Sequence, residues 1–304
     1  MNKKDLIALK DYDKDTLVGL IKRGIELKKG AVPVTEKGKA LAMIFTKPST
    51  RTNVSFQRAI QKLGGSAIYL GAESLQLSRG ETINDTAKTL ARYVDAIMIR
   101  TYSHKDVVDM ALASSVPVIN GLTDLLHPCQ ALGDMMSITE VKGTDYENIK
   151  VVFIGDGNNV CHSLINAAGI LGFQLSVSVP ENFQPDPEVL KPMQQKNSRI
   201  EVVHNPDAAI KNADAVYTDV WVSMGSDKLN EDEKSKFNRY QLNQELLQKA
   251  KPDAIALHCL PAHRGDEITD EVMDGNQSYI FDQAENRMHI QEAILEYLFE
   301  TIGT

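Results

Sequence analysis

Short apolar runs alternate with longer amphipathic stretches along most of the chain. Runs rich in Val, Ile, Ala and Leu are typical of strands buried on both faces, and apolar residues at helical spacing fill the stretches between them. Strands separated by helices indicate parallel sheets with helices on both sides. The predicted strands are Ala40–Phe45, Ala67–Leu70, Ala96–Arg100, Val116–Asn120, Lys150–Ile154, Gln174–Val179, Ile200–His204, Ala215–Asp219, Ala254–Cys259 and Tyr279–Phe281.

This alternation is interrupted once, near Lys142–Asn148, where Gly, Thr and Asp break the apolar pattern. We therefore predict two doubly wound parallel-sheet α/β domains joined by helices, which suits a chain of 304 residues. The predicted domain limits are 1–142 and 149–284. In open sheets of this kind ligands bind beyond the carboxyl ends of the strands, so polar residues at those ends are the candidates for function.

Helices are predicted near both ends of the chain. The first covers about Asp13–Lys29. The last covers Glu285–Ile302 and places Ile290 and Ile294 on one side. Because this helix follows the final predicted strand, with no sheet left to extend, we expect the C-terminal segment 285–304 to return across the first domain.

The composition narrows the possible partners. A net charge of −8 argues against broad binding to nucleic acid or to an anionic membrane. The chain has no apolar run long enough for a signal peptide or a membrane span. Its three cysteines, Cys129, Cys161 and Cys259, are far apart and form neither a disulfide framework nor a metal pattern, which favours a cytoplasmic protein without a bound metal.

The segment Ser49-Thr50-Arg51-Thr52 lies where the first predicted strand gives way to an amphipathic helix. Ser49 is a suitable N-cap for that helix. A helix N-terminus offers unpaired N–H groups and a partial positive charge, and here two hydroxyls and a guanidinium are added. This combination predicts a phosphate-binding site, with a capped helix bearing one solvated Arg as the alternative.

Two further strand ends carry polar side chains. Arg100 ends its strand and would face the same crevice as Arg51, although a surface Arg is the simpler interpretation. His127 and Gln130, within His127-Pro128-Cys129-Gln130, open another helix and lie on one side of its first turn. A His and an amide that face a crevice can bind the carbonyl and amino groups of a small polar ligand.

The segment Gly155-Asp156-Gly157-Asn158-Asn159 follows a strand and partly matches a dinucleotide fingerprint. The third glycine of that fingerprint is missing, and Cys161 and Ser163 lie in the region where it is needed for close packing. A nicotinamide cofactor is therefore not expected. Asn159 is instead a candidate for binding a polar group of a substrate.

The last two candidate motifs follow later strands. Asp219 ends a strand before a loop that contains Ser223 and Met224, and an acid at this place suggests recognition of an amino group. His258-Cys259-Leu260-Pro261 ends another strand, and a sharp exit at the proline, with a cis bond as one form of it, would turn the carbonyls of Cys259 and Leu260 into the crevice. Arg287 adds a third basic residue near the strand ends.

Taken together, these motifs resemble those of the aspartate/ornithine carbamoyltransferase family. The resemblance covers essentially the whole chain, with S-T-R-T, H-P-C-Q, D-x-x-x-S-M-G and H-C-L-P in the family's order and spacing. It implies that the phosphate of carbamoyl phosphate is held by Ser49, Thr50, Arg51, Thr52 and Arg100. It also implies that the carbamoyl end is held by Arg100, His127, Gln130, Arg287 and the backbone carbonyls of Cys259 and Leu260.

The resemblance further implies the second substrate and the reaction. L-ornithine would be bound by Asn159, Asp219, Ser223 and Met224, with Asp219 near its side-chain amine. The neutral δ-amine would attack the carbamoyl carbon, giving citrulline and phosphate without a metal or organic cofactor. Catalysis is assigned to Arg51, Arg100, His127, Asp219 and Cys259, and Asp219 and Cys259 are the candidates that take the amine's proton. Closure of the two domains and of the loop at Ser223 would exclude water.

The family pattern also implies an assembly. Gln76 would reach into the carbamoyl phosphate site of a neighbouring subunit, which requires a homotrimer or a multiple of trimers. One departure is Asn53, where the family usually has a second Arg after S-T-R-T, and another is Thr46, where Glu is frequent. Both lie beside the phosphate motif without changing it.

Other functions remain open at this stage. Within the family, putrescine or acetylornithine could be the acceptor amine, and aspartate is disfavoured because Ser74–Gly80 lacks a lysine. A non-catalytic sensor of a phosphate ligand on the same fold is a further alternative, as is a dehydrogenase. An assay of carbamoyl phosphate with the four amines separates the enzymes.

Overall fold

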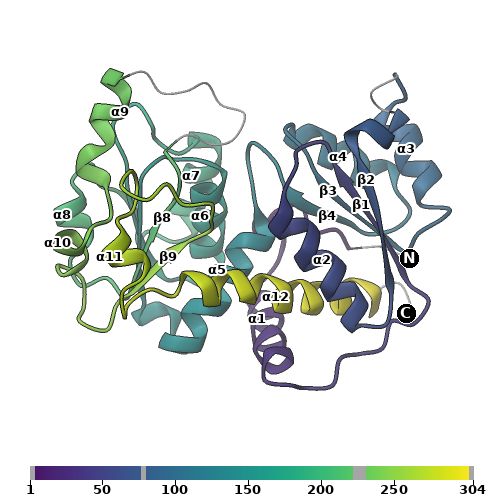
Figure 1. Ribbon diagram of the computed structural model, residues 1–304, viewed down its shortest axis with the longest axis horizontal. Helices are drawn as coiled ribbons and strands as arrows, with labels where there is room; N and C mark the ends of the chain where they lie inside the picture. Colours follow the sequence, from purple (N-terminus) through teal and green to yellow (C-terminus); the bar gives the residue numbers. More distant parts are fainter. Residues whose placement is uncertain (1–3, 77–79, 222–230, 301–304) are drawn as a thin grey trace.

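The computed structural model describes residues 4–76, 80–221 and 231–300, and their strands form two parallel sheets (Figure 1). The first sheet has the order β2-β1-β3-β4 and the second β7-β6-β5-β8-β9. The predicted fold class is confirmed. The strands are β1 Ala40–Phe45, β2 Ser66–Gly71, β3 Ala96–Arg100, β4 Val118–Leu122, β5 Lys150–Ile154, β6 Gln174–Ser178, β7 Ile200–Val202, β8 Ala215–Thr218 and β9 Ile255–His258.

Helices cover both faces of each sheet, so that inner strands such as β1 and β3 are buried on both sides. In β1, for example, Met43 belongs to the core shared with Phe56 of α2, whereas Ile44 belongs to the core under α3 and α4. The helices are α1 Lys14–Lys28, α2 Thr50–Lys62, α3 Ile83–Leu90, α4 His104–Ala113, α5 Pro128–Lys142, α6 Asn159–Leu171, α7 Pro187–Lys196, α8 Pro206–Ala209, α9 Glu231–Phe237, α10 Gln244–Leu247, α11 Asp270–Met273 and α12 Ile280–Glu300, with short 3₁₀ turns at Leu9–Asp11, Ala72–Ser74, Tyr146–Asn148 and Asn238–Tyr240.

The strand orders define where a ligand can bind. In the first sheet the chain runs outward from β1 to β2 and then returns to β3 on the other side, so the crossover direction changes between β1 and β3. In the second sheet the same change falls between β5 and β8. Helices that leave such neighbouring strands on opposite faces open a crevice at the carboxyl edge. The predicted site residues therefore follow the strands that border these crevices.

One predicted strand is wrong. Tyr279–Phe281 does not form a strand, since Ile280 already begins α12 and only Ser278 makes an isolated bridge to Ala256. The three residues have strand-like side chains, but Ile280 and Phe281 belong to the first turn of the long C-terminal helix. In β4 the strand begins at Val118 rather than Val116, and Pro117, which has no N–H to donate, lies just before it.

The C-terminal helix α12 packs against α1, α2 and α5, as expected for a segment that returns to the first half of the chain (Figure 1). Two ion pairs fix it there. Lys62 of α2 pairs with the buried Glu292 at 2.7 Å, and Arg23 of α1 pairs with Glu296 at 2.7 Å. No helix in the described ranges is long and apolar enough to cross a membrane.

Candidate functional site

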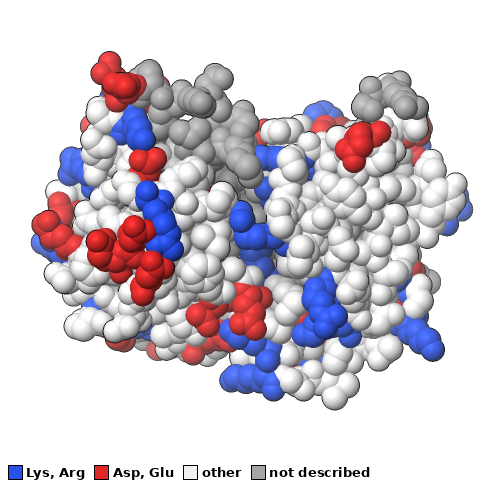
Figure 2. All heavy atoms as spheres, viewed as in Figure 1, with Lys and Arg blue, Asp and Glu red and all other residues white. Residues whose placement is uncertain are grey.

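A cleft of about 220 Å³ lies at the carboxyl ends of the strands of both sheets. Figure 2 shows basic side chains gathered in the hollow between the two halves of the molecule. The cleft brings together ten of the residues predicted from the sequence, which are Ser49, Arg51, Arg100, His127, Gln130, Asn159, Asp219, Cys259, Leu260 and Arg287. Segments more than two hundred residues apart in sequence thus contribute to one site.

Thr52 lies behind the basic side of the cleft and holds two of its arginines in place. It is fully buried in the first turn of α2, and Ser49 caps that turn by accepting from the Thr52 N–H at 3.3 Å. The Thr52 hydroxyl oxygen accepts from Arg100 Nη1 at 3.3 Å and from Arg287 Nη2 at 3.0 Å. Thr52 therefore does not line the cleft; it holds two of the arginines that do.

Arg100 and Arg287 are buried and Arg51 is half-buried, and these three arginines of the cleft lack counter-ions among the described residues. Arg100 and Arg287 are about 5% exposed or less, and in the described part of the chain neither they nor Arg51 forms an ion pair. Burial and the neighbouring Arg287 and Arg51 lower the pKa of Arg100 to about 9, and burial also lowers the pKa of Arg287. The Nε atoms of all three have no hydrogen-bond partner. Since unpaired buried charge is costly, this arrangement favours a bound anion.

His127 is a neutral imidazole in this surrounding. Its pKa is well below the ordinary value, first because the ring is buried and then because Arg287, Arg100 and Lys47 lie nearby. Its Nδ1 has no partner, while its backbone N–H donates to the Ser163 hydroxyl at 2.7 Å. A neutral ring can donate one hydrogen bond to a carbonyl oxygen without a proton having to be removed first.

The segment after β9 connects the two sides of the cleft. Arg51 Nη2 donates to the carbonyl oxygen of Leu260 at 2.7 Å. The bond between Leu260 and Pro261 is cis, as the sequence had suggested, and Leu260 has a left-handed φ of 59°. Residues in such backbone conformations cluster at functional sites. Leu260 lines the cleft, and its carbonyl oxygen is the acceptor for Arg51 there.

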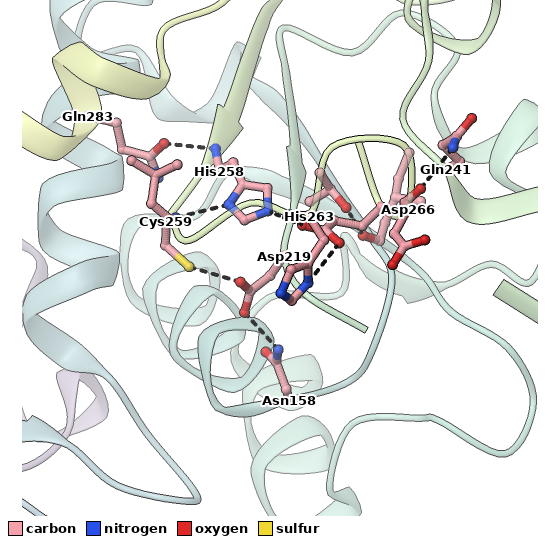
Figure 3. Close-up of polar contacts among 12 residues, drawn as sticks. Asn158, Asp219, Gln241, His258, Cys259, His263, Asp266 and Gln283 are labelled. Carbon is pink, nitrogen blue, oxygen red and sulfur yellow. Dashed lines mark hydrogen bonds and ion pairs between the residues drawn. The ribbon is translucent and has the colours of Figure 1, made fainter. Parts of the chain in front are cut away.

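Asp219 is the centre of the acidic side (Figure 3). Its Oδ1 accepts from the Cys259 thiol at 3.0 Å and its Oδ2 accepts from Asn158 Nδ2 at 2.8 Å. Burial, followed by the charge of Asp219, raises the pKa of the Cys259 thiol well above its ordinary value. The thiol is therefore protonated and acts as a donor, which argues against Cys259 as the group that takes a proton and leaves Asp219 for that role.

The turn before α6 uses its backbone donors within the protein. Asn158 caps α6 by accepting from the N–H groups of Val160 and Cys161, so these donors are already used. A Cβ on Gly157 would lie 2.4 Å from the backbone nitrogen of Pro185, so this glycine serves the close approach of a neighbouring loop. Asn159, which lines the cleft, donates from Nδ2 to the Thr123 carbonyl at 2.5 Å.

Asp219, His258 and Cys259 lie close enough to be considered as metal ligands. The ring of His258 is not free for this purpose. Its Nδ1 accepts from the Leu260 N–H at 2.9 Å and its Nε2 donates to the buried Glu267 at 3.0 Å. The Cys259 thiol donates to Asp219, and both ring nitrogens of His258 are bound to other groups, so these three side chains do not suit a cation.

Some predicted residues lie elsewhere. Thr50 is exposed at the start of α2, and Gln76 is exposed after the turn Ala72–Ser74; neither lines the cleft. Ser223 and Met224 lie outside the described residues. Asn53 points away from the cleft, because its side chain accepts from Gln57 Nε2 at 2.5 Å along the helix.

The sequence interpretation missed several residues of the cleft. Lys47 lines the cleft and is 7% exposed, and its pKa is lowered by burial and by the nearby Arg100. Its place just after β1 was a signal that could have identified it. His263 also lines the cleft, held by its N–H donating to Glu267, and Asn158 supports Asp219. The contact between Asn158 and Asp219 joins residues far apart in the chain, and the contact between His263 and Glu267 lies within an irregular loop.

A cleft between two parallel-sheet units, basic on one side and acidic on the other, suits an anion bound beside an amine. Comparison with family models identifies the protein further. Residues 4–140 match the carbamoyl phosphate-binding domain of aspartate/ornithine carbamoyltransferases, and residues 147–298 match the aspartate/ornithine-binding domain. The chain belongs to the aspartate/ornithine carbamoyltransferase family.

Individual relatives agree with this assignment. The chain is 50% identical to the ornithine carbamoyltransferase of Pyrococcus horikoshii, over 99% of this chain and 97% of that one. The solved structure of the Pyrococcus furiosus ornithine carbamoyltransferase matches with a TM-score of 0.91 at 50% identity, covering 96% of each chain. The anabolic ornithine carbamoyltransferase of Campylobacter jejuni matches with a TM-score of 0.93 at 38% identity, over 98% of this chain and 99% of that one.

Proposed function

We propose that this protein is an ornithine carbamoyltransferase, which transfers the carbamoyl group of carbamoyl phosphate to the δ-amine of L-ornithine and gives L-citrulline and phosphate. The observation that carries the proposal is the set of three arginines, each with a buried Nε atom that has no partner, facing a carboxylate across one cleft. The names of relatives at about half identity over nearly the whole chain support the same substrates.

In this proposal the basic side binds carbamoyl phosphate. Ser49, Arg51 and Arg100 hold the phosphate at the N-terminus of α2, with Thr50 and Thr52 as further parts of the motif. His127 and Arg100 donate to the carbonyl oxygen, and Gln130 Oε1 and the Leu260 carbonyl accept from the carbamoyl amino group. Gln130 Oε1 and His127 Nδ1 are otherwise buried without a partner, so a bound carbamoyl group would satisfy them.

The acidic side binds the amine in its reactive form. The δ-ammonium of ornithine loses a proton to Asp219, whose carboxylate is held in place by Asn158 and Cys259. The amine lone pair then forms the N–C bond, and the carbonyl electrons move onto an oxygen stabilised by His127 and Arg100. When they return, the C–O bond to phosphate breaks, the phosphate keeps the electron pair, and the second proton on the attacking nitrogen passes to that phosphate. Asn159 and the predicted Ser223 and Met224 would hold the rest of ornithine.

The remaining expectations concern assembly and setting. We propose a homotrimer or a multiple of trimers in which Gln76 reaches a neighbouring subunit's site. Exposed Val54, Ile68 and Tyr69 on α2 and the edge strand β2 support a subunit contact there, and light scattering should give a mass that is a multiple of three chains. We also propose the domain limits 1–142 and 149–284, a cytoplasmic location, and arginine synthesis as the direction, because two relatives are titled anabolic.

A product assay tests the activity. Purified protein is incubated with carbamoyl phosphate and, separately, ornithine, putrescine, acetylornithine and aspartate, and each carbamoylated product is quantified. We expect citrulline to form at a kcat/KM at least about 100-fold above any other product, since a site that recognises two ends of a substrate rejects an analogue lacking one. Preferred carbamoylation of another amine would reassign the acceptor, and carbamoyl phosphate binding with no product would favour a sensor.

A further inference from the structure

A fully buried carboxylate lies behind the cleft. Asp134 is on α5, one helical turn after Gln130, and is 0% exposed. Its Oδ1 accepts from Gln130 Nε2 at 2.7 Å and from Gln283 Nε2 of α12 at 2.6 Å. Asp134 does not line the cleft, whereas Gln130 does. A buried acid with no contact to the cleft needs a reason for its presence, because its burial is costly.

The hydrogen bonds around Asp134 can run in only one direction. The backbone N–H of His258 can only donate, and it donates to Gln283 Oε1 at 2.9 Å (Figure 3). Gln283 must therefore present its NH₂ group to Asp134. Oδ1 of Asp134 accepts this bond and the one from Gln130, and a proton on Oδ2 would leave both bonds unchanged.

The direction of these hydrogen bonds fixes the orientation of the Gln130 side-chain amide. Because its NH₂ group is bound by Asp134, its Oε1 is left as the atom available to a ligand, and this oxygen is buried without a partner. If the amide rotated by half a turn, the two N–H bonds of its NH₂ group would face the cleft, where most other polar groups are also donors. Gln130 is thus an acceptor in a site whose other polar groups are mostly donors.

We propose that Asp134 is a positioning residue that holds Gln130 as an acceptor for the carbamoyl amino group, and so makes the site selective for carbamoyl phosphate over acyl phosphates that carry a methyl group there. This inference rests on the proposed function. A methyl group would leave Oε1 buried and unpaired, and a site built to accept from an N–H rejects an analogue that lacks it.

The test compares carbamoyl phosphate with acetyl phosphate in Asp134→Leu, which removes the acceptor but keeps the volume similar. We expect the KM for carbamoyl phosphate to rise about 10-fold or more, while the inhibition constant of acetyl phosphate changes less than about threefold. Asp134→Asn should restore selectivity to within about threefold of the wild type, because Gln283 still directs NH₂ at position 134 and an Asn oxygen can accept it. Asp134→Ser is a second disruptive variant if the Leu variant does not fold.

Ser137→Ala is the matched control. Ser137 lies one turn further along α5, is buried, and accepts from Asn286 Nδ2 of α12 at 2.9 Å, but it does not contact Gln130. Its loss should lower stability without changing the ratio of the two constants. The role of Asp134 would be overturned if Asp134→Leu weakened the binding of carbamoyl phosphate and acetyl phosphate equally. It would also be overturned if Ser137→Ala changed the ratio of the two constants as much as Asp134→Leu does. A wild-type protein that makes no citrulline would instead remove the proposed function.

Discussion

The two sides of the cleft are built in different ways. On the basic side Arg51, Arg100 and Arg287 have buried Nε atoms without a partner, and burial lowers the pKa of the last two. On the acidic side both oxygens of Asp219 already have a donor, from Cys259 and Asn158. The first side is incomplete until an anion arrives, whereas the second is a satisfied network with room for one more donor. The difference suggests that the anion contributes more binding energy than the amine.

The largest effect is expected from Arg51→Ala, which removes a guanidinium from the basic side. We expect kcat/KM for carbamoyl phosphate to fall about 10³-fold, since a charged donor to a phosphate and its leaving oxygen is lost. Steady-state citrulline assays measure this, with circular dichroism to check the fold. Arg58→Ala is the control, because Arg58 is exposed on the same helix. Near-normal synthesis by the Arg51 variant would contradict its role.

A smaller and more selective effect is expected from Asp219→Asn on the acidic side. The amide keeps the shape and can still accept from Asn158, but it cannot take a proton from the amine. We expect kcat to fall about 10²-fold, with the KM for carbamoyl phosphate changed less than about threefold. A loss confined to carbamoyl phosphate affinity would mean that Asp219 acts on carbamoyl phosphate and not on the amine, which would contradict this role.

Replacement of Cys259 should have a more modest effect. Because the thiol donates to Asp219, serine can substitute for it, whereas alanine cannot. We expect a loss in kcat/KM for ornithine of about threefold for Cys259→Ser and about 10-fold for Cys259→Ala. The pH profile should keep its shape, since the raised pKa of the thiol places its ionisation above the working range. Loss of an acidic limb in the serine variant would show that a thiolate takes part.

The smallest effect on activity is expected at Asp156, and it appears in stability. Burial and the charge of Asp219 raise the pKa of Asp156 to about 7, from an ordinary value near 3.8. The folded protein therefore holds this proton more tightly than the unfolded chain, and stability is lost as the pH rises from about 4 to about 7.

Asp156→Asn removes this charge. We expect the variant to exceed the wild type in free energy of unfolding by about 1–3 kcal/mol at pH 8 and by much less at pH 4. Urea denaturation at the two pH values provides the measurement. The pKa of Asp134 is also raised to about 7 by burial, so its contribution to the change of unfolding free energy with pH should remain in the variant. An equal difference at both pH values would mean that Asp156 does not titrate in this range.

The sequence was sufficient for the strands and for most of the residues at their ends. Arg100 and His127 could be predicted because apolar runs locate buried strands, and the residues that follow them meet at one edge of a sheet. The segment Tyr279–Phe281 misled the prediction, since three strand-like side chains carry no local sign of the long helix that includes two of them.

The supporting contacts could not be predicted in the same way. Gln283 and Asp134 are 149 positions apart, and their bond depends on how α12 packs on α5. Lys47 and Asn158 follow predicted strands, but the sequence does not show which residues they contact, and so it did not indicate a role for them. Such contacts arise from packing between elements, which no local pattern records.

Carbamoyl phosphate binding, measured without ornithine by calorimetry, tests the division between the two sides most directly. Wild type, Arg51→Ala and Asp219→Asn are titrated under the same conditions. The account predicts that Asp219→Asn binds within about threefold of the wild type, and that Arg51→Ala binds at least about 100-fold more weakly. Equal weakening in both variants, or unchanged binding in Arg51→Ala, would contradict the claim that the basic side alone holds the anion.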